Sequence, residues 1–171
     1  KTLAAHPFLD AERVGIWGWS GGGSMSLHMI FKYPKLYRAA LSVAPVTALA
    51  LYDTIYEERY MDLPADNPAG YRDGAPVNFA DQLEGELLIV HGTHDDNVHY
   101  QHIDRLVERL VAANKLFEMM AYPNRSHGIY ERSNTRRHLF ETLTSFLTRK
   151  LPAGARCDPD DTKPARSRRA A

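Results

Sequence analysis

Short apolar runs alternate with amphipathic stretches along most of this chain. Four runs of five to seven residues have the length and apolar character of buried strands: 13–18, 39–43, 86–91 and 116–122. Three longer stretches carry apolar residues at three- and four-residue steps and predict helices: 20–33, 103–111 and 136–151. Because strands separated by helices usually pair in parallel through right-handed crossovers, we expect an α/β fold, a mostly parallel sheet with flanking helices.

The segment between the second and third predicted strands follows neither period cleanly. Tyr52, Tyr56 and Tyr60 are four residues apart. This spacing predicts a short helix over 49–60 with an aromatic stripe, and 64–76 is typical of a loop because it is rich in Pro, Gly and Asp. On spacing alone, the tyrosine stripe is expected to pack on the core.

Composition and charge narrow the function classes. The 171 residues include 21 Lys and Arg and 21 Asp and Glu, so the net charge is zero and gives no argument for nucleic acid as a partner. No apolar run reaches the roughly 18 residues of a transmembrane helix. The single Cys157 excludes an intrachain disulfide or a cysteine-based zinc module.

Composition also divides the chain in two. Residues 1–151 form the predicted core-bearing part, whereas 152–171 contain no large aliphatic or aromatic residue and are predicted to be a disordered tail. The first residue is Lys, so the lack of a leader leaves periplasmic, secreted and cytoplasmic locations open.

A G-x-S-x-G pattern lies between the first predicted strand and the helix that follows it. It runs from Gly18 through Trp19, Ser20 and Gly21 to Gly22. A nucleophilic serine needs a sharp turn that lifts its hydroxyl clear of the sheet, and small neighbours permit such a turn. The amide of the next residue, Gly21, then faces a developing oxyanion. A phosphate-binding loop fits less well, because neither nucleotide-binding glycine pattern is present.

A base and an orienting acid follow later predicted strands. Asp95 and Asp96 come after the third strand, and His127 comes after the fourth. The chain order of serine, acid and histidine is that of the α/β-hydrolases, and the carboxyl ends of parallel strands meet at one edge of the sheet. We therefore expect a serine hydrolase that needs no metal or organic cofactor.

Two other classes compete with this interpretation. Histidines crowd the third strand and its loop, where they could supply zinc ligands: His91, His94, His99 and His102. Their stretch crosses from strand to loop to helix and lacks H-E-x-x-H, so the spacing does not place a ligand set on one face. A binding module that keeps a hydrolase fold without catalysis is the second alternative.

Five stretches also carry a family resemblance: IWGWSGGG (16–23), SVAPV (42–46), LYDTIYEERYM (51–61), LLIVHGTHDDNVHY (87–100) and SHGI (126–129). Together they resemble the catalytic domain of the prolyl oligopeptidase family, and within it the dipeptidyl peptidase IV branch. The resemblance covers about residues 13–151. It implies a peptidase that releases N-terminal dipeptides after Pro or Ala, with an acylaminoacyl peptidase or an esterase as the alternative activity.

The resemblance also implies roles for single residues. Ser20 is the nucleophile, Asp95 rather than Asp96 is the orienting acid, and His127 is the general base. The residues that the resemblance implies bind the peptide substrate are Val46, Tyr52, Tyr56, Asn97 and Val98. Two positions depart from the best-known members of the family: Gly21 stands where those members have tyrosine, and Leu49 where they have tryptophan. Strict specificity for proline is therefore less expected than hydrolase chemistry.

The number of predicted strands bears on completeness. An α/β-hydrolase sheet has about eight strands and this chain supplies four candidates, so we expect the C-terminal half of such a domain. The remaining half would hold the second oxyanion donor. The resemblance further implies an upstream β-propeller and leaves a homodimer open. Alone, the chain is expected to expose a strand edge at 13–17, to aggregate and to be nearly inactive.

Overall fold

Four parallel strands form the centre of the fold. The computed structural model describes residue 6 and residues 9–152, so the predicted tail, 152–171, lies outside the described residues except for Pro152. The strands are β1 (Gly15–Trp19), β2 (Ala39–Val43), β3 (Glu86–Gly92) and β4 (Glu118–Tyr122). They pair in the order β1-β2-β3-β4, each parallel to the next. The predicted parallel sheet is thus confirmed, and every strand bound lies within two residues of its prediction.

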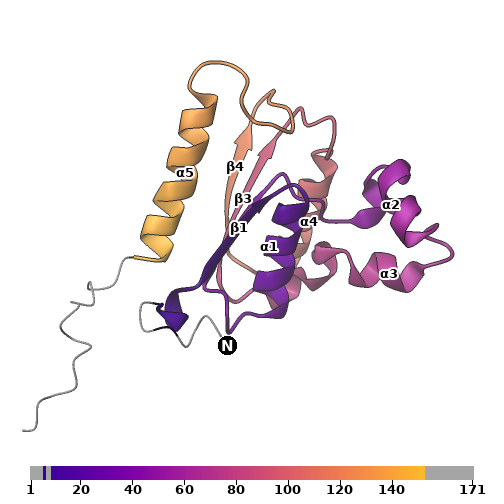
Figure 1. Cartoon of the computed structure of the whole chain (residues 1–171), viewed down its shortest axis with the longest axis horizontal. Helices are drawn as coiled ribbons and strands as arrows, with labels where there is room; N and C mark the ends of the chain where they lie inside the picture. Colours follow the sequence, from indigo (N-terminus) through magenta and orange to yellow (C-terminus); the bar gives the residue numbers. More distant parts are fainter. Residues whose placement is uncertain (1–5, 7–8, 153–171) are drawn as a thin grey trace, which may run out of the picture.

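Helices cover both faces of this sheet (Figure 1). The three long helices are α1 (Gly21–Lys32), α4 (Gln101–Ala112) and α5 (Thr135–Lys150). Helices α1 and α4 lie on one face and α5 on the other, and each matches a predicted helix within two residues at either end. No helix in the described part of the chain is long and apolar enough to span a bilayer.

Strand β3 contributes to two separate layers of core. Leu87 and Ile89 pack with residues of α1 and α4, whereas Leu88 and Val90 pack with residues of α5. Because alternate side chains of a strand point to opposite faces, a strand covered on both faces is apolar throughout. This burial explains the unbroken apolar run at 87–90.

The segment between β2 and β3 differs from its prediction. Instead of one helix over 49–60, it forms a 3-10 turn, η3 (Leu49–Leu51), followed by α2 (Thr54–Met61). Asp53 separates the two, because its carboxylate accepts a hydrogen bond from the Tyr56 amide at 2.9 Å and caps the new helix.

The predicted loop over 64–76 is also wrong, because α3 (Pro68–Asp73) lies within it. Asn67 caps α3 by accepting from the Gly70 amide at 3.0 Å, and Pro68 occupies the first helical position, where a missing N–H costs nothing. In the described residues, two further 3-10 helices are η2 (Ala11–Arg13) and η4 (Pro76–Gln82). Helices α2 and α3 lie together at one side of the molecule (Figure 1).

Two surfaces of this fold carry exposed aromatic side chains. Tyr56 and Tyr60 on α2 are 55% and 67% exposed, so the expectation that the tyrosine stripe packs on the core is wrong. Strand β1 has a strand neighbour on one side only within the described sheet, and its Trp17 is 56% exposed.

Candidate active site

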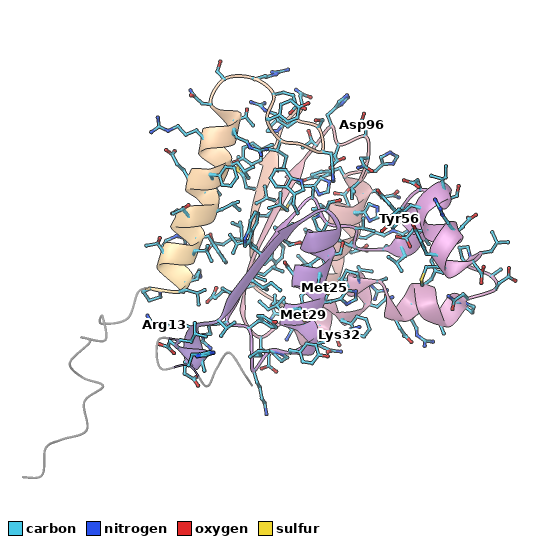
Figure 2. The ribbon with its side chains drawn as sticks, in the orientation of Figure 1. Arg13, Met25, Met29, Lys32, Tyr56 and Asp96 are labelled. Atoms are coloured by element: carbon cyan, nitrogen blue, oxygen red, sulfur yellow. The ribbon has the colours of Figure 1, made fainter. Side chains whose placement is uncertain are left out.

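The carboxyl ends of three strands bring the predicted chemistry to one edge of the sheet. Ser20 follows β1, Asp95 lies three residues beyond β3, and His127 follows β4 by five residues. Figure 2 labels Asp96 at this end of the molecule and Arg13, which precedes β1, at the opposite end. The parallel topology therefore places residues that are 75 and 32 positions apart in the sequence at one edge.

Ser20 has a backbone conformation that few non-glycine residues adopt. Its φ is 56° and its ψ is −123°. Its amide donates to the carbonyl of Val43 at 2.8 Å, and its own carbonyl accepts from the Ser24 amide at 3.0 Å, so the turn is held on both sides. A strained residue between a strand and a helix is the geometry of a nucleophile elbow.

The close approach that this turn needs depends on Gly18 and Gly23. A Cβ at Gly18 would overlap the carbonyl of Gly22, and one at Gly23 would lie 2.7 Å from the carbonyl oxygen of Val43. By contrast, a Cβ at Gly21 or Gly22 would meet nothing within 4 Å. The expectation that the turn needs small neighbours thus holds at Gly18 and at Gly23, whereas the second motif glycine, Gly22, has open space.

Asp95 is a buried carboxylate with four N–H neighbours. Its Oδ1 accepts from the amides of Asn97 at 3.0 Å and Val98 at 2.8 Å. Its Oδ2 lies 2.8 Å from Nδ1 of His127 and 3.1 Å from Nε2 of His91. Burial raises the pKa of the carboxyl, but the hydrogen bonds from His127, His91 and Val98 outweigh that effect and hold the pKa well below its usual range.

His127 is oriented through both its ring and its backbone. Because Asp95 is an acceptor only, Nδ1 of His127 carries the proton between them, which leaves Nε2 free to accept another. The carbonyl of His127 accepts from the indole Nε1 of Trp19 at 3.0 Å. Within the described residues, the hydroxyl of Ser20 makes no hydrogen bond to His127. Such a bond is often loose in a site without substrate.

The residues implied to bind substrate separate into an exposed and a buried set. Tyr52 donates its hydroxyl proton to Oδ1 of Asn97 at 3.0 Å, and its ring meets the edge of Tyr56 at a centroid distance of 5.6 Å. Val46 and Val98 are buried, at 7% and 0% exposure. The structure therefore brings Tyr52, Tyr56 and Asn97 together, whereas the two valines are buried.

Comparison with known proteins decides the family. The model of the prolyl oligopeptidase family matches residues 1–153. This chain belongs to that family. The resemblance noted in the sequence is thus confirmed, and with it membership of a serine peptidase family.

Individual relatives of this prolyl oligopeptidase chain are dipeptidyl peptidases. It is 40% identical over 150 residues to a probable dipeptidyl-aminopeptidase B of Uncinocarpus reesii, covering 86% of this chain and 16% of the relative. It is 36% identical to dipeptidyl peptidase 4 of Bos taurus, covering 86% and 20%.

A solved structure agrees with the computed fold. The crystal structure of Porphyromonas gingivalis dipeptidyl peptidase 4 superposes with a TM-score of 0.85 at 42% identity, covering 87% of this chain and 21% of that one. This similarity confirms the predicted α/β fold with flanking helices. The chain spans about a fifth or less of each of these three relatives.

Two histidines of the histidine-rich stretch in this prolyl oligopeptidase chain, His91 and His102, are held by protein contacts. His91 contacts Asp95 and the Val98 carbonyl, and Nδ1 of His102 accepts from the Thr47 amide at 3.1 Å. Among the residues that the structure describes, no three His, Cys, Asp or Glu side chains are grouped as a metal would require. The ligand set that the zinc alternative needs is absent from this part.

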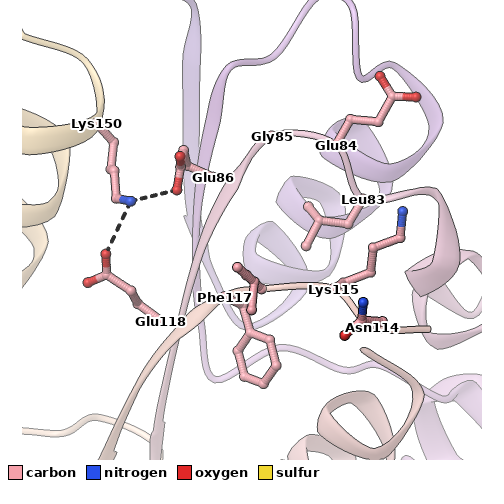
Figure 3. Close-up of a pocket in the computed structure, with 10 residues that line it drawn as sticks. Leu83, Glu84, Gly85, Glu86, Asn114, Lys115, Phe117, Glu118 and Lys150 are labelled. Atoms are coloured by element: carbon pink, nitrogen blue, oxygen red, sulfur yellow. Dashed lines mark ion pairs between the residues drawn. The ribbon is translucent and has the colours of Figure 1, made fainter. Parts of the chain in front are cut away.

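A separate hollow of about 360 Å³ lies at the amino ends of β3 and β4 (Figure 3). Lys150 on α5 reaches across it to Glu86 at 2.7 Å and to Glu118 at 3.6 Å. The candidate catalytic residues follow the carboxyl ends of the strands, so this hollow lies at the other end of the sheet.

Sequence reasoning missed three contacts that support the site of this family member. They are the indole of Trp19 on the His127 carbonyl, the imidazole of His91 on Asp95, and the carboxylate of Glu131, which accepts from the amide and hydroxyl of Ser126. The sequence singled out His91 only as one histidine of a crowded stretch, because no periodicity or motif indicates which buried partner a polar side chain in a strand will contact.

Proposed function

We propose that this chain carries the catalytic residues of a serine exopeptidase that releases N-terminal dipeptides after Pro or Ala. One observation carries the proposal, namely the 2.8 Å contact between Nδ1 of His127 and buried Asp95. This contact lies at the edge of the sheet where strained Ser20 follows β1. A carboxylate, an oriented imidazole and a serine on a sharp turn are the parts that acyl transfer needs.

In the proposed acylation step, Oγ of Ser20 attacks the peptide carbonyl carbon while its proton moves to Nε2 of His127. The carbonyl oxygen becomes an oxyanion that the Gly21 amide stabilises. When the C–N bond breaks, the electron pair leaves with the amine nitrogen, which takes the proton from Nε2. Asp95 stays ionised throughout and stabilises the transient imidazolium.

Deacylation repeats these transfers with water. A water molecule gives a proton to Nε2 of His127 as its oxygen attacks the ester carbon. The ester bond to Ser20 then breaks, the proton returns to Oγ, and the dipeptide leaves with a free carboxyl group.

The exposed aromatic set supports a peptide with a small penultimate residue. Tyr52 and Tyr56 present ring faces and edges suited to an apolar ring such as that of Pro. Asn97, bonded to Tyr52, offers an amide for the peptide backbone. Beside Ser20, Gly21 has open space where a Cβ would stand, so the pocket is expected to accept Ala as well as Pro.

A fluorophosphonate probe tests the nucleophile in the complete polypeptide that contains this chain. The wild type is expected to react covalently, and Ser20→Ala to remain unlabelled. Ser24→Ala is the matched control, because Ser24 lies one helical turn away and, among the described residues, its hydroxyl bonds only to the Ser20 carbonyl, at 3.2 Å. Equal labelling of the wild type and Ser20→Ala would refute the proposal.

Chromogenic substrates then separate the activities within the same mechanism. Cleavage of Xaa-Pro and Xaa-Ala anilides with a free amino terminus is expected. Cleavage of N-acylated aminoacyl substrates or simple esters alone would favour the acylaminoacyl peptidase or esterase alternative. A protein that binds peptides but is never labelled would be the non-catalytic module.

A further inference from the structure

His91 is a buried imidazole in direct contact with the candidate acid of the site. It is the penultimate residue of β3 and is 0% exposed. Its Nε2 lies 2.8 Å from the carbonyl oxygen of Val98 and 3.1 Å from Oδ2 of Asp95. Its ring meets Tyr100 edge-on at a centroid distance of 5.7 Å. The chemistry proposed above assigns no role to this side chain.

The two partners of His91 fix its tautomer. A backbone carbonyl and an ionised carboxylate are both acceptors, so Nε2 must carry the proton that they share. The other nitrogen, Nδ1, is buried and has no hydrogen-bond partner among the described residues. A proton there would be a buried donor without an acceptor, so the neutral ring with its proton on Nε2 fits the site.

We propose that His91 is a positioning residue, whose Nε2–H holds Oδ2 of Asp95 in line with Nδ1 of His127 and takes a share of the carboxylate's charge. This inference rests on the proposed function, because it assigns His91 to the support of that catalytic pair. His91 contacts neither the reacting serine nor the substrate and acts only through Asp95.

The geometry shows why a second donor matters at Oδ2. The other oxygen, Oδ1, is already fixed by the amides of Asn97 and Val98. Without His91, Oδ2 would face His127 alone, and rotation of the carboxylate would be limited only by its backbone contacts. His91 also bonds to the Val98 carbonyl, so one imidazole of β3 contacts both the Asp95 carboxylate and the loop that caps it.

Charge sharing gives this role a signature that packing alone would not give. An oxygen that accepts two N–H groups is a weaker partner for each one. Removal of the His91 donor should therefore strengthen the pairing between Asp95 and the His127 imidazolium and raise the pKa of His127. Titratable groups near His91 are Tyr100, which precedes α4, and His102 within α4. Beside His127, Glu131 bonds to Ser126 and Arg136 bonds to the Gly128 carbonyl. All four remain in place in this test.

Two amide substitutions in the complete polypeptide separate positioning from packing. In His91→Gln the side-chain amide reaches about as far as Nε2 does, whereas in His91→Asn it reaches only as far as Nδ1. We expect His91→Asn to lower kcat by about 10- to 100-fold, the loss typical when a side chain that orients a functional residue is removed. KM should change less than about twofold. His91→Gln should recover most of this loss.

The acidic limb of the kcat/KM profile provides the second readout. It should move to higher pH in His91→Asn and stay near the wild-type position in His91→Gln. Equal kcat values for the two variants, or an unmoved limb in His91→Asn, would overturn the proposal. Thermal unfolding of both variants shows whether a loss of activity reflects loss of the fold.

Imidazole NMR keeps this test independent of the proposed function. In histidine-labelled protein, the titration of His127 reports the same pKa rise without any turnover, and the nitrogen shifts of wild-type His91 report its tautomer. A proton on Nδ1 of His91 would overturn the inference even if both variants failed to fold. Failure of the proposed function would instead appear as wild-type protein that no fluorophosphonate labels.

Discussion

The indole N–H of Trp19 donates a hydrogen bond of 3.0 Å to the backbone carbonyl of His127, 108 positions later in the chain. Trp19 is the last residue of β1 and immediately precedes Ser20. The bond therefore joins the strand that carries the candidate nucleophile to the loop that carries the candidate base. No other hydrogen bond of the described residues links these two segments directly.

Substitution of Trp19 should impair catalysis more than it impairs folding. Trp19→Phe removes the donor to the His127 carbonyl, a neutral bond worth about 1 kcal/mol. If this bond orients His127, its loss should lower kcat/KM for an Xaa-Pro substrate about fivefold, because about 1 kcal/mol in the activation barrier corresponds to that change in rate. Trp17→Phe is the matched control, because Trp17 points to the same side of β1 and is exposed. Identical kinetics of the two variants would show that the bond does not position His127.

The two glycines of the G-x-S-x-G pattern should respond differently to alanine. Gly18→Ala places a Cβ against the Gly22 carbonyl, so the turn must open, at an expected cost of about 3 kcal/mol or more in the free energy of unfolding. Gly22→Ala meets no atom and lies in α1, so it should gain up to about 1 kcal/mol from helix propensity. Urea unfolding followed by tryptophan fluorescence measures both, and similar stabilities would contradict the packing described at Gly18.

The open space at Gly21 should control substrate preference. Gly21→Tyr adds an aromatic side chain beside Ser20, where it gains contact with a proline ring but little with an alanine methyl group. We expect kcat/KM for Xaa-Pro relative to Xaa-Ala to rise about tenfold, equivalent to about 1.4 kcal/mol of selective contact. Gly21→Ala adds only a Cβ and should leave the ratio near that of the wild type. A ratio that tyrosine does not change would place the specificity pocket elsewhere.

Acid should loosen the contact between α4 and the segment that leads to Tyr52. Burial and the nearby His91 lower the pKa of His102 to about 4, whereas an unfolded histidine titrates near 6.5. Between these two values the unfolded chain binds a proton that the native chain does not, so the free energy of unfolding should fall by about 3 kcal/mol as pH drops from 6.5 to 4. The native pKa of the Asp95 carboxyl is depressed, so this group makes the free energy of unfolding depend on pH only below about pH 4.

The variant His102→Asn isolates this contribution. Its amide oxygen can still accept from the Thr47 amide, as Nδ1 does now, but it does not titrate. Urea midpoints between pH 4 and 6.5 should therefore depend less on pH than those of the wild type. Parallel curves for the two proteins would remove His102 as the source of the acid sensitivity.

The ion pairs across the hollow of Figure 3 should contribute little to stability. Lys150 is bonded to Glu86 at 2.7 Å, but its side chain is 26% exposed and that of Glu86 is 48% exposed, so water and salt weaken the attraction. Lys150→Met should cost about 0.5 to 1 kcal/mol in low salt and less in 1 M salt. Lys115 lines the same hollow and has no ion pair among the described residues, so Lys115→Met should not measurably change the free energy of unfolding. A loss above 2 kcal/mol for Lys150→Met would contradict this weak coupling.

The sequence predicted the elements that follow a single regular pattern. The strand at 39–43 was predicted with the correct bounds because it is buried at every position and reads as a short apolar run. The bounds of α1 were predicted to within one residue because its buried residues recur at three- and four-residue steps. The segment with α2 and α3 was mispredicted because its boundaries depend on Asp53 and Asn67, whose capping bonds are local and override the longer tyrosine period.

The candidate site was predictable only in its chemical residues. Ser20, His127 and the adjacent Asp95 and Asp96 follow strand ends in an order that has chemical meaning, so spacing suggested them, and the family resemblance selected Asp95. Trp19 and His91 act through contacts with residues 108 and four positions away. In the sequence Trp19 appears as one more residue of an apolar strand, and His91 appears as one of several crowded histidines. Only the folded backbone shows that their polar atoms meet the His127 loop and the carboxylate.

The surroundings of Asp95 also bear on how this site responds to its medium. Its negative charge is balanced by two backbone amides and two imidazoles, and no Lys or Arg side chain pairs with it in the described part of the chain. Dissolved ions screen separated charges over several ångströms but do not enter short, buried contacts of this kind. The fold itself solvates the carboxylate, so we expect Asp95 to orient His127 equally well at low and at high salt concentration.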